Sequence, residues 1–335
     1  MVQIKHFENL CENKWQSLLL GNGASIALHN KFSYPTLHGV ACTAGLLPKT
    51  APIFDKIGTT DFEHTLLACW YADKINKALG NPSNDISEAY EEVRSALISA
   101  VREVHPEHAN ITTELHRVAS FASRFQTVIS LNYDLTMYWA MLIFNEKNKN
   151  WFKDAFKHGV FESDWEYLRQ PHNGVQGSTL VFYPHGNLSI ARDHLEEETK
   201  IEASPGATGN LLETITDRWL SGDFVPVFVS EGRSKDKVAA IYRSHYLTNV
   251  YEQVLPKLGN KLVIYGWSFD ERDQHILDAI FRNKPEQIAV SVYINQSTDD
   301  PAAYCSRVIS AVKGLSQDTA VTFFDSQSPK CWNNP

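Results

Sequence analysis

The chain has 335 residues, a net charge of −8 at pH 7 and a hydrophobic fraction of 43%. This length is enough for one large α/β domain or two small ones with an ample core. The acidic balance argues against a dedicated nucleic-acid-binding protein, because neutralising phosphates requires clustered Lys and Arg. No apolar run reaches the roughly 18 residues of a membrane-spanning helix.

The five cysteines are scattered, and no two of them form a C-x-x-C pair. This spacing indicates neither a zinc ribbon nor a disulfide framework. The N-terminal residues lack the apolar core of a signal peptide. We therefore expect a cytoplasmic protein with no metal, no membrane association and no direct contact with nucleic acid.

Short apolar runs predict buried strands along most of the chain. They lie at residues 17–21, 126–131, 179–184, 225–230, 261–265, 288–294 and 320–324. Because these runs are unbroken rather than alternating, they favour a parallel sheet covered on both faces. Helical periodicity is clearest over residues 86–104, 114–125 and 271–283. Strands and helices in alternation predict a Rossmann-like, doubly wound α/β fold.

The spacing of these elements predicts a single domain over residues 1–335. Its sheet core takes residues 15–29 and 126–325, and a large helical insertion or subdomain of about residues 30–125 follows the first strand. Residues 147–178 and 189–222 are rich in polar residues, Gly and Pro, which predicts loops or lids.

Small, polar or titratable residues follow the predicted strands. In an open parallel sheet, ligands bind beyond the carboxyl ends of the strands, so these residues are the candidates for a site. They are Gly21, Asn22, Gly23, Ala24 and Ser25 after the first strand, Asn132 and Asp134 after the second, His185 after the third, Gly266 and Ser268 after the fifth, and Asn295 after the sixth.

Each candidate also has a purely structural interpretation. Gly21 and Gly23 are compatible with a tight turn, Asn132 with an Asx-turn and Asp134 with a helix cap. A nicotinamide dehydrogenase is disfavoured, because the dinucleotide fingerprint requires a third glycine where Ile26 stands and an acidic residue that is absent from residues 32–54. No P-loop motif is present. Asp270 and Asp273 fit the start of a helix.

The order of the motifs narrows these alternatives. G-N-G-A-S, S-L-N-Y-D, P-H-G, Y-G-W-S-F-D and Y-I-N follow one another along the chain. In this order the chain resembles the SIR2-like (sirtuin) family over about residues 17–296. It is most similar to divergent bacterial SIR2-like proteins of antiphage defence, which share the L-L-L-G-N-G-A-S opening, the Phe62-Glu63 pair, N-Y-D, Y-G-x-S-F and a segment like residues 229–247.

One departure from the family bears on the activity. Protein deacetylases of the family carry a four-cysteine zinc module after the catalytic histidine, and no such module follows His185 here. The strand that clamps an acetyl-lysine peptide is not recognisable either. The resemblance therefore implies cleavage of the nicotinamide–ribose bond of NAD+ without a metal, and water becomes the expected nucleophile.

The resemblance also implies a role for each candidate residue. Residues 21–25, with Gly266 and Ser268, would hold the pyrophosphate, and Asn295 would contact the adenosine ribose. Asn132 would lie beside the nicotinamide ribose, and Asp134 would brace Asn132 or contact the nicotinamide amide. His185 would be the general base, since an imidazole with a pKa near 6.5 suits neutral pH.

These roles predict an NAD+ glycohydrolase that releases nicotinamide and ADP-ribose, acting in antiphage defence by NAD+ depletion. Two alternatives remain: a sensor module that binds NAD or an ADP-ribose-type signal without turnover, and a protein deacylase or ADP-ribosyltransferase. Because an unregulated NADase would harm its own cell, we expect control by the insertions, by homo-oligomerisation or by a partner such as a HerA-like ATPase.

Overall fold

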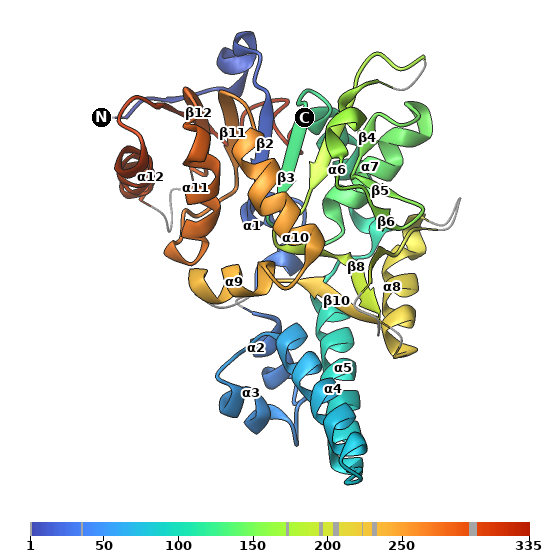
Figure 1. Ribbon diagram of the computed structural model, residues 1–335. Helices are drawn as coiled ribbons and strands as arrows, with labels where there is room; N and C mark the ends of the chain where they lie inside the picture. Colours follow the sequence, from blue (N-terminus) through green and yellow to red (C-terminus); the bar gives the residue numbers. More distant parts are fainter. Residues whose placement is uncertain are drawn as a thin grey trace.

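An eight-stranded parallel sheet forms the centre of the molecule (Figure 1). The computed structural model describes residues 2–34, 36–171, 174–193, 197–203, 208–222, 224–229, 233–294 and 300–335. In spatial order, the strands of the sheet are β1 (Ile4–Lys5), β13 (Ala320–Asp325), β12 (Gln287–Val292), β11 (Lys261–Tyr265), β2 (Ser17–Leu20), β3 (Thr127–Ser130), β7 (Thr179–Phe182) and β4 (Phe152–Lys153).

The central strands are buried on both faces, as their unbroken apolar sequences predict. Every residue of β2, β3 and β7 is buried. The register places Leu18 of β2 beside Val263 on one side and Val128 on the other. The predicted doubly wound α/β fold is confirmed.

The chain reverses its direction across the sheet at β2. From β2 it proceeds to β3 and β7, and it later returns to the other side of β2 to build β11, β12 and β13 outwards. The carboxyl ends of β2 and β11 therefore form a topological switch point, where open α/β sheets bind their ligands.

A second, antiparallel sheet has the spatial order β10 (Phe224–Phe228), β8 (Gly186–Asp193), β9 (Glu198–Lys200), β6 (Val160–Phe161) and β5 (Phe156–Lys157). Two predictions are corrected by it. The run at 225–230 forms β10, which pairs with β8 and lies outside the parallel sheet. Residues 189–222 are largely strand and helix rather than loop, because β8 continues to Asp193 and α8 begins at Leu211.

The longer helices are α2 (Leu37–Thr43), α3 (Ala51–Ile57), α4 (Phe62–Ala78), α5 (Asn84–Val104), α6 (His108–Ala122), α7 (Thr136–Lys147), α8 (Leu211–Leu220), α9 (Ser234–Ile241), α11 (Gln274–Ile280) and α12 (Pro301–Leu315). Short turns of helix include α1 (Asn22–Ile26), α10 (His245–Asn249) and the 3₁₀ turn η7 (Glu271–Asp273). The predicted helix over 271–283 is therefore divided, with η7 before α11.

Helices α2 to α5, which lie within the predicted insertion at about residues 30–125, form a lobe that projects from the sheets (Figure 1). A buried charge network joins this lobe to the second sheet. Arg192 of β8 lies 4.0 Å from the Glu63 carboxylate of α4 and 3.1 Å from that of Glu198. Burial, with the nearby Asp61 carboxylate, raises the pKa of Glu63 to about 8, while Arg192 opposes the shift.

The C-terminal residues pack against the start of the fold. Trp332 is 1% exposed, and its Nε1 donates to the carbonyl of Ala24 at 2.8 Å. Its ring contacts Tyr265 of β11 and Phe121 of α6. In the described part of the chain, no helix is both long enough and apolar enough to cross a bilayer.

Replacing Trp332 tests the importance of this packing. Because Trp332→Ala removes a buried aromatic ring and the donor to the Ala24 carbonyl, we expect it to lower the free energy of unfolding by about 3–5 kcal/mol. Ile75→Ala, at a side chain that is 58% exposed, should cost less than about 1 kcal/mol. Urea unfolding measures both; equal losses for the two variants would contradict this account.

Candidate functional site

A cavity of about 1070 Å³ opens at the carboxyl ends of the strands around the switch point. Its size lies at the upper end of the range for small-molecule sites, about 300–1,000 Å³, which suits a large ligand. Its walls include most of the residues predicted from the sequence: Gly21, Asn22, Gly23, Asn132, Asp134, His185, Gly266 and Ser268. Residues from four separate strand ends thus meet in one space.

The first and fifth strand exits touch through their backbones. The N–H groups of Gly21 and Gly23 donate to the carbonyls of Tyr265 and Gly266, at 2.9 and 2.8 Å. A Cβ on Gly21 would lie 2.6 Å from the Gly266 carbonyl oxygen, and one on Gly266 only 2.3 Å from the Ala24 nitrogen. Gly266 also has a φ of +68°, a conformation that L side chains rarely adopt. The contact alone explains these glycines, so they do not require a phosphate.

The same contact changes the roles expected for residues 21–25. The N–H groups of Gly21 and Gly23 are already used between the loops and are not directed at the cavity. Ala24 is fully buried. Of the five residues, Gly21, Asn22 and Gly23 line the cavity, and Ala24 and Ser25 lie behind its wall.

Ser25 joins two of the predicted catalytic residues. Its buried hydroxyl donates to the Asp134 carboxylate and accepts from the amide of Asn132 at 2.9 Å. The Asn132 amide also donates to the Gly21 carbonyl at 3.0 Å. The Ser25 hydroxyl therefore orients Asn132 rather than facing a phosphate, and Asp134 braces Asn132 indirectly, through Ser25.

The loop that carries Asn132 and Asp134 is also fixed from the second sheet. The Asn187 amide of β8 donates to the Asp134 main-chain carbonyl at 2.6 Å, and the other Asp134 carboxylate oxygen accepts from the Thr136 N–H at 2.8 Å. Leu188 N–H donates to the Tyr133 carbonyl at 2.8 Å. Asn187 was not predicted, although its position in H-G-N, two residues after His185, was a signal that could have indicated it.

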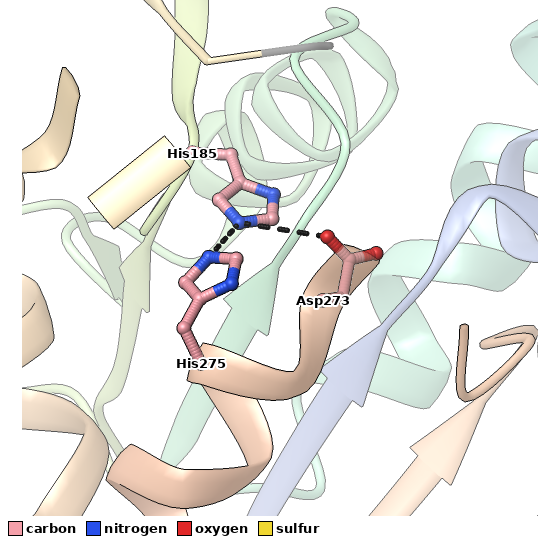
Figure 2. A group of neighbouring side chains, drawn as sticks. All are labelled: His185, Asp273 and His275. Atoms are coloured by element: carbon pink, nitrogen blue, oxygen red, sulfur yellow. Dashed lines mark hydrogen bonds and ion pairs between the residues drawn. The ribbon is translucent and has the colours of Figure 1, made fainter. Parts of the chain in front are cut away.

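His185 lies between β7 and β8, and its ring faces the side chains of His275 and Asp273 (Figure 2). Its Nε2 is 2.9 Å from Nε2 of His275 and 4.0 Å from a carboxylate oxygen of Asp273. The ring also makes a hydrogen bond with the backbone of Leu131. The next residue, Gly186, has a φ of +76°, and a Cβ there would meet the Val227 carbonyl oxygen at 2.1 Å. Glycine thus allows β8 to begin directly after His185.

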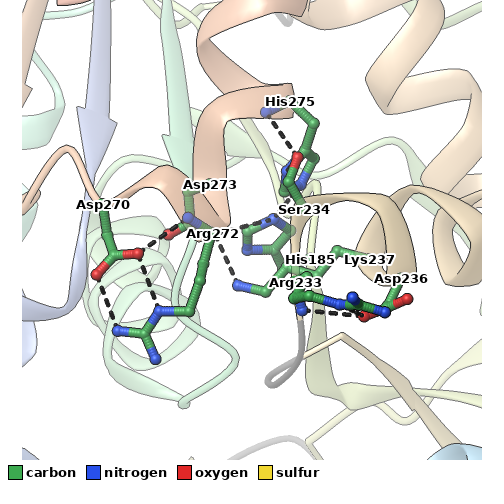
Figure 3. A network of polar contacts seen from close by, with 9 residues as sticks. All are labelled: His185, Arg233, Ser234, Asp236, Lys237, Asp270, Arg272, Asp273 and His275. Atoms are coloured by element: carbon green, nitrogen blue, oxygen red, sulfur yellow. Dashed lines mark hydrogen bonds and ion pairs between the residues drawn. The ribbon is translucent and has the colours of Figure 1, made fainter.

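Two further polar residues, Lys237 and Ser234, complete this group (Figure 3). The Lys237 ammonium of α9 is 2.7 Å from the Asp273 carboxylate, and both line the cavity. Ser234 Oγ lies 3.2 Å from Nδ1 of His275. Asp273 was predicted only as a helix start, and Lys237, Ser234 and His275 were not predicted, because the contacts that join them are tertiary.

The electrostatics keep both imidazoles neutral. Burial and the Lys237 ammonium lower the pKa of His185 to about 3, while Asp273 opposes the shift. Burial likewise lowers the pKa of His275 to about 4. Burial alone would raise the pKa of Asp273, but His185 and Lys237 hold it below its ordinary value. The expected pKa near 6.5 for His185 is therefore corrected downwards.

His185, Asp273 and His275 are also the group among the described residues whose donor atoms could hold a metal, lying within 4.8 Å of one another. Two imidazoles and a carboxylate suit a transition metal. However, the two Nε2 atoms are already within hydrogen-bond distance of each other, and the Asp273 oxygen nearest His185 already bonds the Lys237 ammonium. The contacts of the group are satisfied by protons and a lysine, so we derive no chemistry through a metal.

The far end of the cavity lies beside β12 and α12. Tyr293, Asp300, Tyr304 and Arg307 line it together with Ser268. The guanidinium of Arg307 lies over the Tyr304 ring at 5.4 Å. Asn295, predicted to contact the adenosine ribose, falls outside the described residues.

Residues 18–332 match the model of the family described as "Domain of unknown function (DUF4917)". The chain belongs to the DUF4917 family. The match spans the parallel sheet except for β1, together with the helical lobe and the second sheet. No curated protein matches the chain.

Two glycine-to-alanine substitutions, one at the contact and one as a control, test the backbone contact at the cavity. Gly266→Ala introduces both a strained φ and a clash with residues 23 and 24, so we expect a loss of more than about 2 kcal/mol of unfolding free energy. The control is Gly314→Ala in α12, where an added Cβ meets nothing within 4 Å; it should be neutral or stabilise by up to about 1 kcal/mol. Denaturant unfolding measures the unfolding free energy of both variants. Equal values for the two would refute the backbone contact.

The lowered pKa of His185 predicts a pH effect on stability. Below pH 6.5 the unfolded chain takes up a proton on this imidazole that the folded chain excludes until about pH 3. The stability linked to His185 is therefore complete above pH 6.5 and lost as the pH falls towards 3. Thermal unfolding of wild type and His185→Gln across this window should show a shallower pH dependence in the variant. Parallel curves would contradict the burial of a neutral imidazole.

Proposed function

We propose that the protein is an NAD+ glycohydrolase that releases nicotinamide and ADP-ribose. The observation that carries the proposal is the convergence of Asn132, His185 and the loop at Gly21–Gly23 on one cavity at the switch point. Doubly wound sheets bind dinucleotides across this position. The cavity also has the size for such a ligand.

A dinucleotide would span the cavity from His185 to Tyr304. The nicotinamide ribose would lie beside Asn132, and the pyrophosphate would pass Asn22 and Ser268. The adenosine would approach Tyr304, where Arg307 supplies a positive charge near the phosphates. The proposed phosphate contacts differ from those first expected, because Ser25 and the N–H groups of Gly21 and Gly23 are committed elsewhere.

The reaction needs positioning more than strong acid or base catalysis. When the bond between ribose C1′ and nicotinamide breaks, its electron pair neutralises the pyridinium nitrogen, so nicotinamide leaves without protonation. The ribose gains oxocarbenium character, as in glycoside hydrolysis. A water oxygen then bonds to C1′, and its proton passes through His185 to solvent.

The residues around the cavity divide this task. Asn132, fixed by Ser25 and Gly21, would hold a ribose hydroxyl or the attacking water. His185 would accept the proton of the water, and the Asp273 carboxylate at 4.0 Å would stabilise the imidazolium that results. Lys237 holds that carboxylate ionised.

A second candidate is a sensor that binds NAD+ without cleaving it. One observation favours it: both ring nitrogens of His185 are engaged in hydrogen bonds within the protein.

Depletion of NAD+ in antiphage defence, assembly into homo-oligomers and pairing with a HerA-like ATPase remain predictions from the resemblance to SIR2-like proteins.

Two substitutions test the glycohydrolase. Asn132→Ala and His185→Ala should each lower nicotinamide release at least about 100-fold, since positioned proton transfer contributes roughly 10²–10⁴-fold. His245→Ala, away from the cavity, is the matched histidine control and should equal wild type. Chromatography of the products from NAD+ measures all four proteins. Wild-type rates in both cavity variants would refute the site, and NAD+ that binds but stays intact would establish the sensor.

A further inference from the structure

The hydrogen bonds around His185 fix which nitrogen carries its proton. The bond with the Leu131 backbone raises the pKa of the ring, so it is one in which the imidazole donates to a carbonyl. A neutral imidazole has one N–H and one lone pair. Nε2 is the atom that faces His275, so Nδ1 is left for Leu131, and we assign the proton to Nδ1 and the lone pair to Nε2.

His275 must therefore be the donor in the contact between the two rings. With a proton on its own Nε2, its Nδ1 is an acceptor, and the Ser234 hydroxyl lies 3.2 Å from it. Ser234 Oγ in turn accepts the His275 main-chain N–H at 3.3 Å. Every proton then has one consistent place: Ser234 donates to His275, His275 to His185, and His185 to Leu131.

This arrangement leaves His185 without a free lone pair. A general base must present a lone pair to the proton that it removes, and the one on His185 is filled by a neighbouring N–H at 2.9 Å. His275 does not line the cavity, whereas His185, Asp273 and Lys237 do. His275 thus occupies the lone pair of His185 from behind the cavity wall, where it would not contact a ligand.

We propose that His275 is a positioning residue that blocks His185 in the resting chain, and that turnover requires the bond between their Nε2 atoms to open. The inference rests on the proposed function, in which His185 is the base. Once His275 withdraws, the Asp273 carboxylate at 4.0 Å is an acceptor that Nε2 can face. Exchanging a neutral donor for a carboxylate turns a masked imidazole into a usable base. An NADase controlled in this way turns over slowly until its α9–α11 region is disturbed.

Two substitutions of similar size at His275 distinguish a residue that blocks His185 from one that supports it. His275→Leu fills the space without an N–H, whereas His275→Gln keeps an N–H donor near the position of Nε2. The first readout is carbethoxylation of His185 by diethyl pyrocarbonate at pH 7, located by mass spectrometry, since this reagent needs a free imidazole lone pair. The second readout is nicotinamide release from NAD+. His245→Leu serves as the surface control.

We expect His275→Leu to raise both His185 labelling and nicotinamide release at least tenfold, and His275→Gln and His245→Leu to match wild type. Unchanged labelling in His275→Leu would overturn the proposal, as would higher labelling with slower nicotinamide release. Higher labelling with no nicotinamide from any of the proteins would support the block and refute the glycohydrolase. If His275→Leu does not fold, Ser234→Ala, which removes the donor to His275, should raise labelling in the same direction, and an unchanged value would count against the block.

Discussion

The backbone contact between the ends of β2 and β11 is the constraint on which the cavity depends. Two adjacent parallel strands leave the sheet in different directions at the switch point, and their exits approach closely enough that Gly21, Gly23 and Gly266 leave no room for a Cβ. The paired N–H and carbonyl groups satisfy each loop with the other. Because the exits are locked together, the residues that follow β3 and β7 face a rigid wall.

The second constraint is the balance of charge around His185. Three titratable groups and a lysine share a largely buried space, and only Asp273 and Lys237 are charged at neutral pH. Their opposite charges cancel, and the two imidazoles stay neutral. His185 can accept one proton when substrate reaches the imidazole. Before that, the lowered pKa keeps the imidazole neutral. A hydrolase under control, as proposed here, would use this difference in His185 protonation between its resting and its working state.

Much of the fold followed from the sequence, because unbroken apolar runs such as residues 17–20 and 261–265 have few alternatives to buried parallel strands. The run at 225–230 was wrongly assigned to the parallel sheet for the same reason. β10 is just as buried as those strands, and no local sequence pattern shows that it belongs to the second sheet. The meeting of Asn132 with His185 was predictable from strand ends alone. The direction of the Ser25 hydroxyl was not, nor were the contacts of Lys237 and His275, since they depend on how α9 and α11 pack across the switch point.

The proposed function requires that this cavity holds a dinucleotide with its nicotinamide ribose between Asn132 and His185. A crystal structure with a non-cleavable carbocyclic analogue of NAD+ tests it most directly. We expect the ring that replaces the nicotinamide ribose within hydrogen-bond distance of the Asn132 side chain, the pyrophosphate beside Asn22 and Ser268, and the adenosine near Tyr304. An analogue bound in the opposite direction, or one found outside the cavity, would contradict it.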